Sequence, residues 1–86
     1  MKRIIDTELH LGTNITGKRI RQLRKKRKVS QTQLSAQLET MAVYVCRGSI
    51  SRIENGVRFV TDIELQALAK VLDVSVEELF KEDSEI

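Results

Sequence analysis

Residues 47–56 read Arg47-Gly48-Ser49-Ile50-Ser51-Arg52-Ile53-Glu54-Asn55-Gly56, and their polarity repeats with the period of an α-helix. On a 3.6-residue period Ile50 and Ile53 fall on one side, and the other side collects Arg47, Gly48, Ser51 and Arg52. Gly56 can adopt the left-handed conformation that ends a helix. We therefore predict a helix over residues 47–54 with one packed face and one free face. A helix this short is unstable alone, so its neighbours must hold it.

The composition fits one small helical domain. Its 86 residues suffice for a single core, and the apolar residues are mainly Leu, Ile and Val at helical spacing. Cys46 is the only cysteine and His10 the only histidine, so we expect no disulfide, no metal site and no cofactor. Neither a signal peptide nor a membrane-spanning stretch is evident, and a cytoplasmic protein is expected.

The charge of the chain is strongly polarised although its net value is only +3. The charged residues of 17–28 are all basic, and those of 61–86 are mostly acidic. The basic residues are Lys18, Arg19, Arg21, Arg24, Lys25, Lys26, Arg27 and Lys28. A polyanion is therefore expected on the basic side, with a solvated charged face as the simpler alternative.

Four further helices are predicted around the central one, each from a cap and an apolar stripe. A first begins after Asn14 or Thr16 and runs to about Lys28; a second runs from Gln31, after the cap Ser30, to about Met41. Thr61 with Glu64 and Ser75 with Glu78 are capping signals for the last two. The residues expected to face inward are Ile20, Leu23, Leu34, Leu38, Met41, Ile63, Leu65, Leu68, Ala69, Leu72, Leu79 and Phe80.

The expected organisation is a compact all-α domain of five helices at residues 14–81. Residues 1–13 form an N-terminal arm and residues 82–86 an acidic tail. Val43, Tyr44 and Val45 precede the central helix and are expected to cover the core. Arg24 lies near the apolar face of the first helix, where a charge needs a partner.

This pattern resembles the lambda-repressor-like, Cro/repressor-type helix-turn-helix family over about residues 15–80. The resemblance rests on Ile20–Arg27 with Val29-Ser30-Gln31, on Gln33-Leu34 with Leu38, on Ser49–Gly56, and on Leu65–Leu72 with Val74-Ser75 and Leu79-Phe80. In that family the third helix enters the major groove of DNA. The resemblance implies a lambda-repressor-like fold, double-stranded DNA as partner and a transcription regulator, more specifically a repressor.

The resemblance also implies roles for particular residues. Arg47, Gly48, Ser51 and Arg52 become the base-reading set, in which arginine can donate two hydrogen bonds to guanine. Arg24 and Glu54 correspond to the family's internal ion pair. The expected phosphate contacts, which fix register without reading sequence, are Gln31, Asn55, Arg58 and Lys28.

Two features depart from the family pattern. The connection from Glu39 to Arg47 is about five residues longer than usual and contains no glycine, which a longer second helix would absorb. The arm at residues 1–13 has no counterpart in the core pattern. Because the reading surface is small, we expect a homodimer on half-sites roughly 34 Å apart, joined through the fourth and fifth helices or through the arm.

Two other classes of function compete with DNA reading. The same fold could serve as a protein-interaction module, for example an antitoxin, whose contacts with a protein partner matter more than any operator. An enzyme is not expected, because the sequence contains no nucleophile with a base, no paired carboxylates in an apolar pattern and no phosphate-cradling glycine loop.

Overall fold

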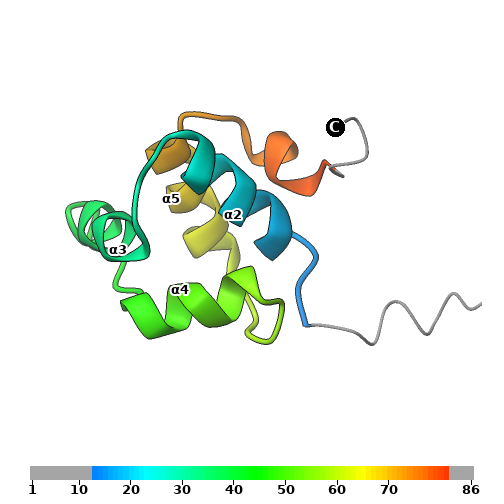
Figure 1. Cartoon of the computed structure of the whole chain (residues 1–86), viewed down its shortest axis with the longest axis horizontal. Helices are drawn as coiled ribbons and strands as arrows, with labels where there is room; N and C mark the ends of the chain where they lie inside the picture. The colour runs from blue at the N-terminus through cyan, green and yellow to red at the C-terminus, as the bar shows by residue number, and fades with distance from the viewer. Residues whose placement is uncertain (1–12, 82–86) are drawn as a thin grey trace, which may run out of the picture.

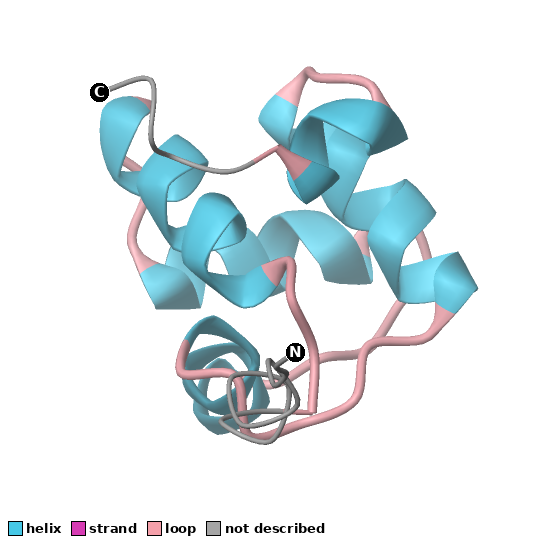
Figure 2. Cartoon of the chain, turned by 90° about the vertical axis from the view of Figure 1, so that its right-hand side faces the viewer, coloured by secondary structure: helices cyan, strands magenta, loops and turns pink. Residues whose placement is uncertain are grey.

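The computed structural model describes residues 13–81, which contain helices and loops but no strand (Figures 1 and 2). The elements are α2 (Gly17–Lys26), α3 (Gln31–Glu39), α4 (Arg47–Glu54), α5 (Asp62–Leu72) and the 3-10 helix η1 (Val76–Phe80). The all-α class is thus confirmed for these residues. The predicted count of five helices is not exact, because residues 13–81 contain four α-helices and the last element is a 3-10 helix, whose short length suits i→i+3 hydrogen bonds.

The core lies between α2 and α5, and α3, α4 and η1 close it from different sides. Every buried hydrophobic side chain of residues 13–81 is aliphatic. The buried set is Ile20, Leu23, Leu34, Leu38, Val45, Ile50, Ile53, Ala67, Leu68, Ala69, Leu72 and Leu79. Both phenylalanines and the single tyrosine are exposed, so aromatic residues contribute little to the interior.

Short-range side-chain hydrogen bonds begin three of the helices, as the sequence predicts. The hydroxyls of Ser30, Thr61 and Ser75 each accept from the backbone N–H three residues later, and the first two form complete capping boxes. At α2 the N-cap residue is Thr16, but the side chain that accepts from Gly17 N, at 2.7 Å, is that of Asn14.

The four α-helices of the described residues, α2 to α5, end in the same way, with one residue at positive φ followed by valine. The positive-φ residues are Lys28, Ala42, Gly56 and Asp73, with φ between 60° and 79°. At each end the N–H of the following valine bonds to a carbonyl five residues earlier, which is a Schellman motif. Of the four, only Gly56 was foreseen, since the other three residues are not glycine.

Three residues that were expected to face the core are exposed. α3 ends at Glu39, so Met41 lies in the following turn and is 37% exposed. Ile63 is 66% exposed because it lies about 200° around α5 from Leu65, which packs inward. Phe80 is 48% exposed, because in a 3-10 helix it points about 120° away from the buried Leu79.

Most of the expected arm and the expected tail cannot be compared with the structure. Residues 1–12, with most of the expected arm and His10, and the tail at residues 82–86 lie outside the described residues. Thr13 is described, and its N–H donates to Gly56 O at 2.6 Å. Among the helices at residues 13–81, none has the length and apolar character needed to cross a membrane.

Candidate nucleic-acid interface

α4 presents two chemically different faces, as its sequence predicts. Ile50 and Ile53 are each only 1% exposed and pack into the core beside α2 and α3. Arg47 and Arg52 are exposed, and Gly48 and Ser51 are half-buried between them. The helix has the predicted bounds, Arg47–Glu54. The four residues expected to read bases therefore lie together on the side of α4 that faces away from the core.

The long connection between α3 and α4 is a loop, contrary to the expected extension of the second helix. α3 stops at Glu39 because Ala42 takes positive φ and the N–H of Val43 bonds back to Leu38 O. Residues 43–46 form no helix, and burial alternates along them, since Val43 is half-buried, Tyr44 exposed and Val45 buried. Val45 is buried as expected, whereas Tyr44 is 74% exposed and does not cover the core.

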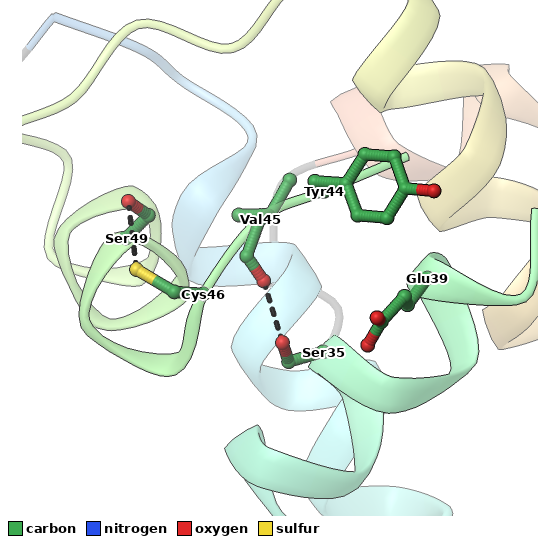
Figure 3. Close-up of a pocket in the computed structure, with 6 residues that line it drawn as sticks. All are labelled: Ser35, Glu39, Tyr44, Val45, Cys46 and Ser49. Atoms are coloured by element: carbon green, nitrogen blue, oxygen red, sulfur yellow. Dashed lines mark hydrogen bonds between the residues drawn. The ribbon is translucent and has the colours of Figure 1, made fainter. Parts of the chain in front are cut away.

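The loop is attached to α3 beside the start of α4 (Figure 3). Ser35 Oγ donates to the carbonyl oxygen of Val45 at 2.7 Å, on one wall of a pocket of about 330 Å³. Cys46 is the N-cap of α4 but accepts no capping hydrogen bond; its thiol donates to Ser49 Oγ at 3.4 Å. Hydrogen bonds that Ser49 can donate to the thiolate form lower the pKa of Cys46. The Ser35 bond fixes the point at which α4 begins.

Arg24 and Glu54 form the expected ion pair, in a buried position between α2 and α4. Arg24 Nε donates to Glu54 Oε2 at 2.6 Å and Arg24 Nη2 to Glu54 Oε1 at 3.0 Å. Arg24 Nη1 also donates to Val29 O at 2.8 Å, and Gln31 Nε2 donates to Glu54 Oε1 at 3.0 Å. One carboxylate thus connects α2, the start of α3 and the end of α4.

The four residues expected to contact phosphate occupy two kinds of environment. Lys28 and Asn55 are exposed, and Gln31 is half-buried with its amide on Glu54. Arg58 is half-buried and donates two hydrogen bonds to Glu64, at 3.0 and 3.1 Å, and one to Phe59 O. Arg58 in turn lowers the pKa of Glu64 by hydrogen bonding. Two of these residues thus have intramolecular partners that the sequence analysis did not foresee.

The basic run of α2 also contributes structural contacts. Arg19 pairs with Glu78 of η1, and Arg27 Nη1 donates to Leu72 O at 3.4 Å. Leu72 is the last residue of α5, where carbonyl groups are unsatisfied and a cation is favoured. Part of the charge that indicated a polyanion therefore holds α2 against α5 and η1.

Asn14 is a structural residue whose main role the sequence analysis missed. Its Nδ2 donates to the carbonyl oxygens of Ile53, at 3.1 Å, and Arg58, at 2.8 Å. The side chain therefore joins the segment before α2 to the end of α4. An asparagine near a helix start indicates a cap, and no local pattern indicates contacts with residues about forty positions away.

Comparison with known proteins agrees with this geometry. A model of the helix-turn-helix family, lambda repressor/Cro-like, matches residues 20–79. That range includes α3, α4 and the Arg24–Glu54 pair, whereas Asn14 and Gly17 precede it. Neither the curated proteins nor the solved structures give a significant match. The family consists of DNA-binding regulatory domains and is not a family of enzymes. The chain belongs to the lambda repressor/Cro-like helix-turn-helix family.

Proposed function

We propose that this protein is a sequence-specific regulator of transcription that reads the major groove of double-stranded DNA with α4. The observation that carries the proposal is the division of α4 into a buried aliphatic face and an exposed face with two arginines. A helix of this width fits the major groove. Its family is one in which the second helix of the pair enters that groove.

In this proposal Arg47 and Arg52 supply most of the base discrimination. Each guanidinium can donate to O6 and N7 of a guanine, a contact worth about 1–3 kcal/mol against the wrong base. Between the two arginines, the hydroxyl of Ser51 can donate or accept a hydrogen bond, but its side chain reaches less far. Gly48 has no side chain, so nothing projects from α4 at this position and DNA could approach the helix closely. A Cβ there would meet only Arg52 Nη1, at 3.8 Å.

Phosphate contacts would fix the register of α4 in the groove. Lys28 and Asn55 are exposed and can reach phosphates directly. Gln31 stands at the first position of α3, where backbone N–H groups favour an anion, although one amide hydrogen is directed to Glu54. Arg58 would contact phosphate with the hydrogens that its bonds to Glu64 and Phe59 leave over.

The proposed unit on DNA is a homodimer, and its proposed effect is repression. One short helix contacts few bases, and two copies double that number on a two-fold related operator. A protein bound over an operator excludes other proteins from it, which is the simplest route to repression. The proposed location of the protein is the cytoplasm. No cofactor is part of the proposal.

The test is selection from a randomised duplex library with the purified full chain, at about 150 mM salt to suppress purely ionic attraction. A matched variant carries Arg47→Ala and Arg52→Ala. We expect a two-fold symmetric motif with the parent protein and none with the variant. If the parent selects no motif, the proposal is wrong, and capture of a protein partner, as for an antitoxin, becomes the next experiment.

A further inference from the structure

The two ends of α4 are attached to the rest of the domain in unequal ways. The helix begins near α3 and ends near the entry to α2 (Figure 1). At its last turn, Asn14 Nδ2 donates to Ile53 O at 3.1 Å. Glu54 accepts hydrogen bonds from Arg24 and Gln31. This end is therefore held from α2, from α3 and from the segment before α2, so the loss of one contact leaves others in place.

The first turn of α4 has less support. Its N-cap residue, Cys46, accepts no capping hydrogen bond from α4. The preceding loop is bonded to the end of α3 as far as Val43, whose N–H donates to Leu38 O. Between that point and α4, a single side-chain hydrogen bond from another element reaches the loop within residues 13–81. It is the bond of 2.7 Å from Ser35 Oγ to Val45 O.

We propose that Ser35 is a positioning residue for base reading, which acts through the start of α4. The inference deepens the proposed function and rests on it for the consequence at the bases. Val45 lies two residues before Arg47, so a shift of its carbonyl group moves Arg47 and Gly48 with it. A binding side chain must be held within about 0.5 Å of its productive position. The Ser35 hydroxyl thus controls discrimination at the bases that face the start of α4, and not at the base that faces Arg52.

The loop before α4 needs such a directional contact. Residues 40–46 separate α3 from α4, and a connection of this length can join the two helices in many conformations. Val45 is buried, but apolar burial has no preferred direction, so it limits the depth of the chain and not the exact place where α4 begins. A hydrogen bond has a preferred distance and angle. The bond from Ser35 therefore supplies the constraint that burial of Val45 leaves open.

The hollow beside this bond separates a positioning role from a purely stabilising one. Ser35, Val45, Cys46 and Ser49 are among the residues that line this hollow of about 330 Å³ (Figure 3). When the hydroxyl is removed, a water molecule has room and polar partners there, and it can donate to Val45 O. Such a water satisfies the carbonyl group but is not attached to α3. Loss of the hydroxyl should therefore cost little stability while it releases the start of α4.

Hydrogen exchange of the free full chain is the first test. The N–H of Ile50 donates to Cys46 O, which is the first hydrogen bond of α4. At the other end, the N–H of Asn55 donates to Ser51 O. In Ser35→Ala we expect the Ile50 amide to exchange about tenfold faster and the Asn55 amide to keep the parent's rate. Equal acceleration at both ends, or acceleration at neither, would overturn the proposal.

A conservative variant and a matched control accompany this measurement. Ser35→Thr keeps the hydroxyl and should restore the parent's exchange rate at Ile50. Thr40→Ala removes another hydroxyl near the end of α3, but that hydroxyl donates to Gln37 O, at 2.6 Å, and the bond stays within the same end of α3. Thr40→Ala should leave the exchange of Ile50 unchanged. Circular dichroism checks that each variant folds.

A base-by-base binding profile tests the consequence for reading. Each base pair of the selected duplex is replaced in turn, and Arg47→Ala and Arg52→Ala identify the positions that each arginine reads. Ser35→Ala should lose about fivefold or more of the discrimination at the positions assigned to Arg47, and should keep it at those assigned to Arg52. Ser35→Thr should recover the parent's profile. A uniform loss at every position would show a merely structural role and would contradict the proposal.

The two experiments separate failure of this inference from failure of the proposed function. If the parent selects no duplex, base reading by α4 is wrong, and the exchange rate of Ile50 still decides whether Ser35 positions the helix. If a duplex is selected and Ser35→Ala retains the parent's base profile, DNA reading stands and the positioning role of Ser35 is wrong.

Discussion

The α-carbon of Gly17, at the start of α2, packs directly against the carbonyl oxygen of Ile53, near the end of α4. A Cβ added to Gly17 would lie 1.9 Å from that oxygen, closer than two non-bonded atoms can approach. Asn14 donates to the same oxygen at 3.1 Å. The entry to α2 and the end of the candidate reading helix are therefore built as one unit, and a glycine is required where they meet.

Replacing Gly17 with alanine should destabilise the protein, because the backbone of α2 must move away from α4. Overpacking of this kind costs about 1–3 kcal/mol. Gly48→Ala is the matched control: it also lies in the first turn of a helix, but the nearest atom to its Cβ is 3.8 Å away. Thermal unfolding should show a lower midpoint for Gly17→Ala and an equal or higher one for Gly48→Ala. Equal midpoints for both variants would contradict the close packing.

Glu54→Ala should be strongly destabilising, because it leaves the buried guanidinium of Arg24 without its anion. Removing one partner of a buried ion pair typically costs about 3–5 kcal/mol. The double variant Arg24→Met with Glu54→Leu removes both charges and should recover most of the loss. Denaturant unfolding measures both effects. A double variant as unstable as Glu54→Ala would show that the loss comes from packing and not from the stranded charge.

Arg52→Ala should weaken binding to a selected operator far more than binding to random DNA. The loss of one good guanine contact corresponds to about 1–3 kcal/mol of discrimination. Lys70→Ala, which removes an exposed cation from α5, is the control for general charge effects and should change both affinities little. Titrations at several salt concentrations separate the two contributions. An equal loss on both duplexes would mean that Arg52 contacts only phosphate.

Ala42→Gly should stabilise the protein, because Ala42 is held at φ 61° at the end of α3. The left-handed conformation costs a non-glycine residue about 1–2 kcal/mol, and the greater freedom of glycine when unfolded offsets part of the gain. The same substitution at Ala36, exposed inside α3, should destabilise by about 0.5–1 kcal/mol. Changes of the same sign at both positions would refute the assignment of strain at Ala42.

The Arg58–Glu64 pair should make stability fall at low pH. Hydrogen bonding from Arg58 lowers the pKa of Glu64 from its ordinary value of 4.5. A carboxylate with a lowered folded pKa stabilises the fold above its unfolded pKa, and this stability is lost as the pH falls through the folded pKa. Glu64→Gln keeps the capping box but removes this titration. The free energy of unfolding of the variant should therefore fall less than that of the parent between about pH 5 and about pH 2.5. The exposed Glu77→Gln should retain the parent's slope, and identical slopes for all three proteins would contradict the prediction.

Several elements were predictable because the interactions that form them are local. The bounds of α4, the capping boxes at Ser30 and Thr61, and the inward direction of Ile50 and Ile53 follow from hydrogen bonds and side-chain spacing within a few residues. The pairing of Arg24 with Glu54 was inferred from the family resemblance and from the position of Arg24 near an apolar face. The structure contains that pair.

Other features depend on residues far apart in the chain. The positive φ of Lys28, Ala42 and Asp73 was not predicted, because only glycine is a strong local signal for that conformation, and the valine that follows each of them packs on a core that the tertiary fold creates. Local periodicity also mistook Met41 and Ile63 for inward-facing residues. Periodicity identifies the apolar face of a helix, but whether a residue at the edge of that face is buried depends on which other helices pack against it.

The sequence by itself determined that residues 13–81 form an all-α domain of the helix-turn-helix family and which residues of α4, the candidate reading helix, are exposed, because caps and amphipathic spacing act over three or four residues. Only the tertiary structure decided where Asn14 is used, which partners hold Gln31 and Arg58, and that Phe59 and Phe80 share one surface with Ile15. Asn14 and Arg58 are 44 positions apart, and no local rule constrains a contact over that separation. Such contacts form only once the packing of the helices has fixed the distances between them.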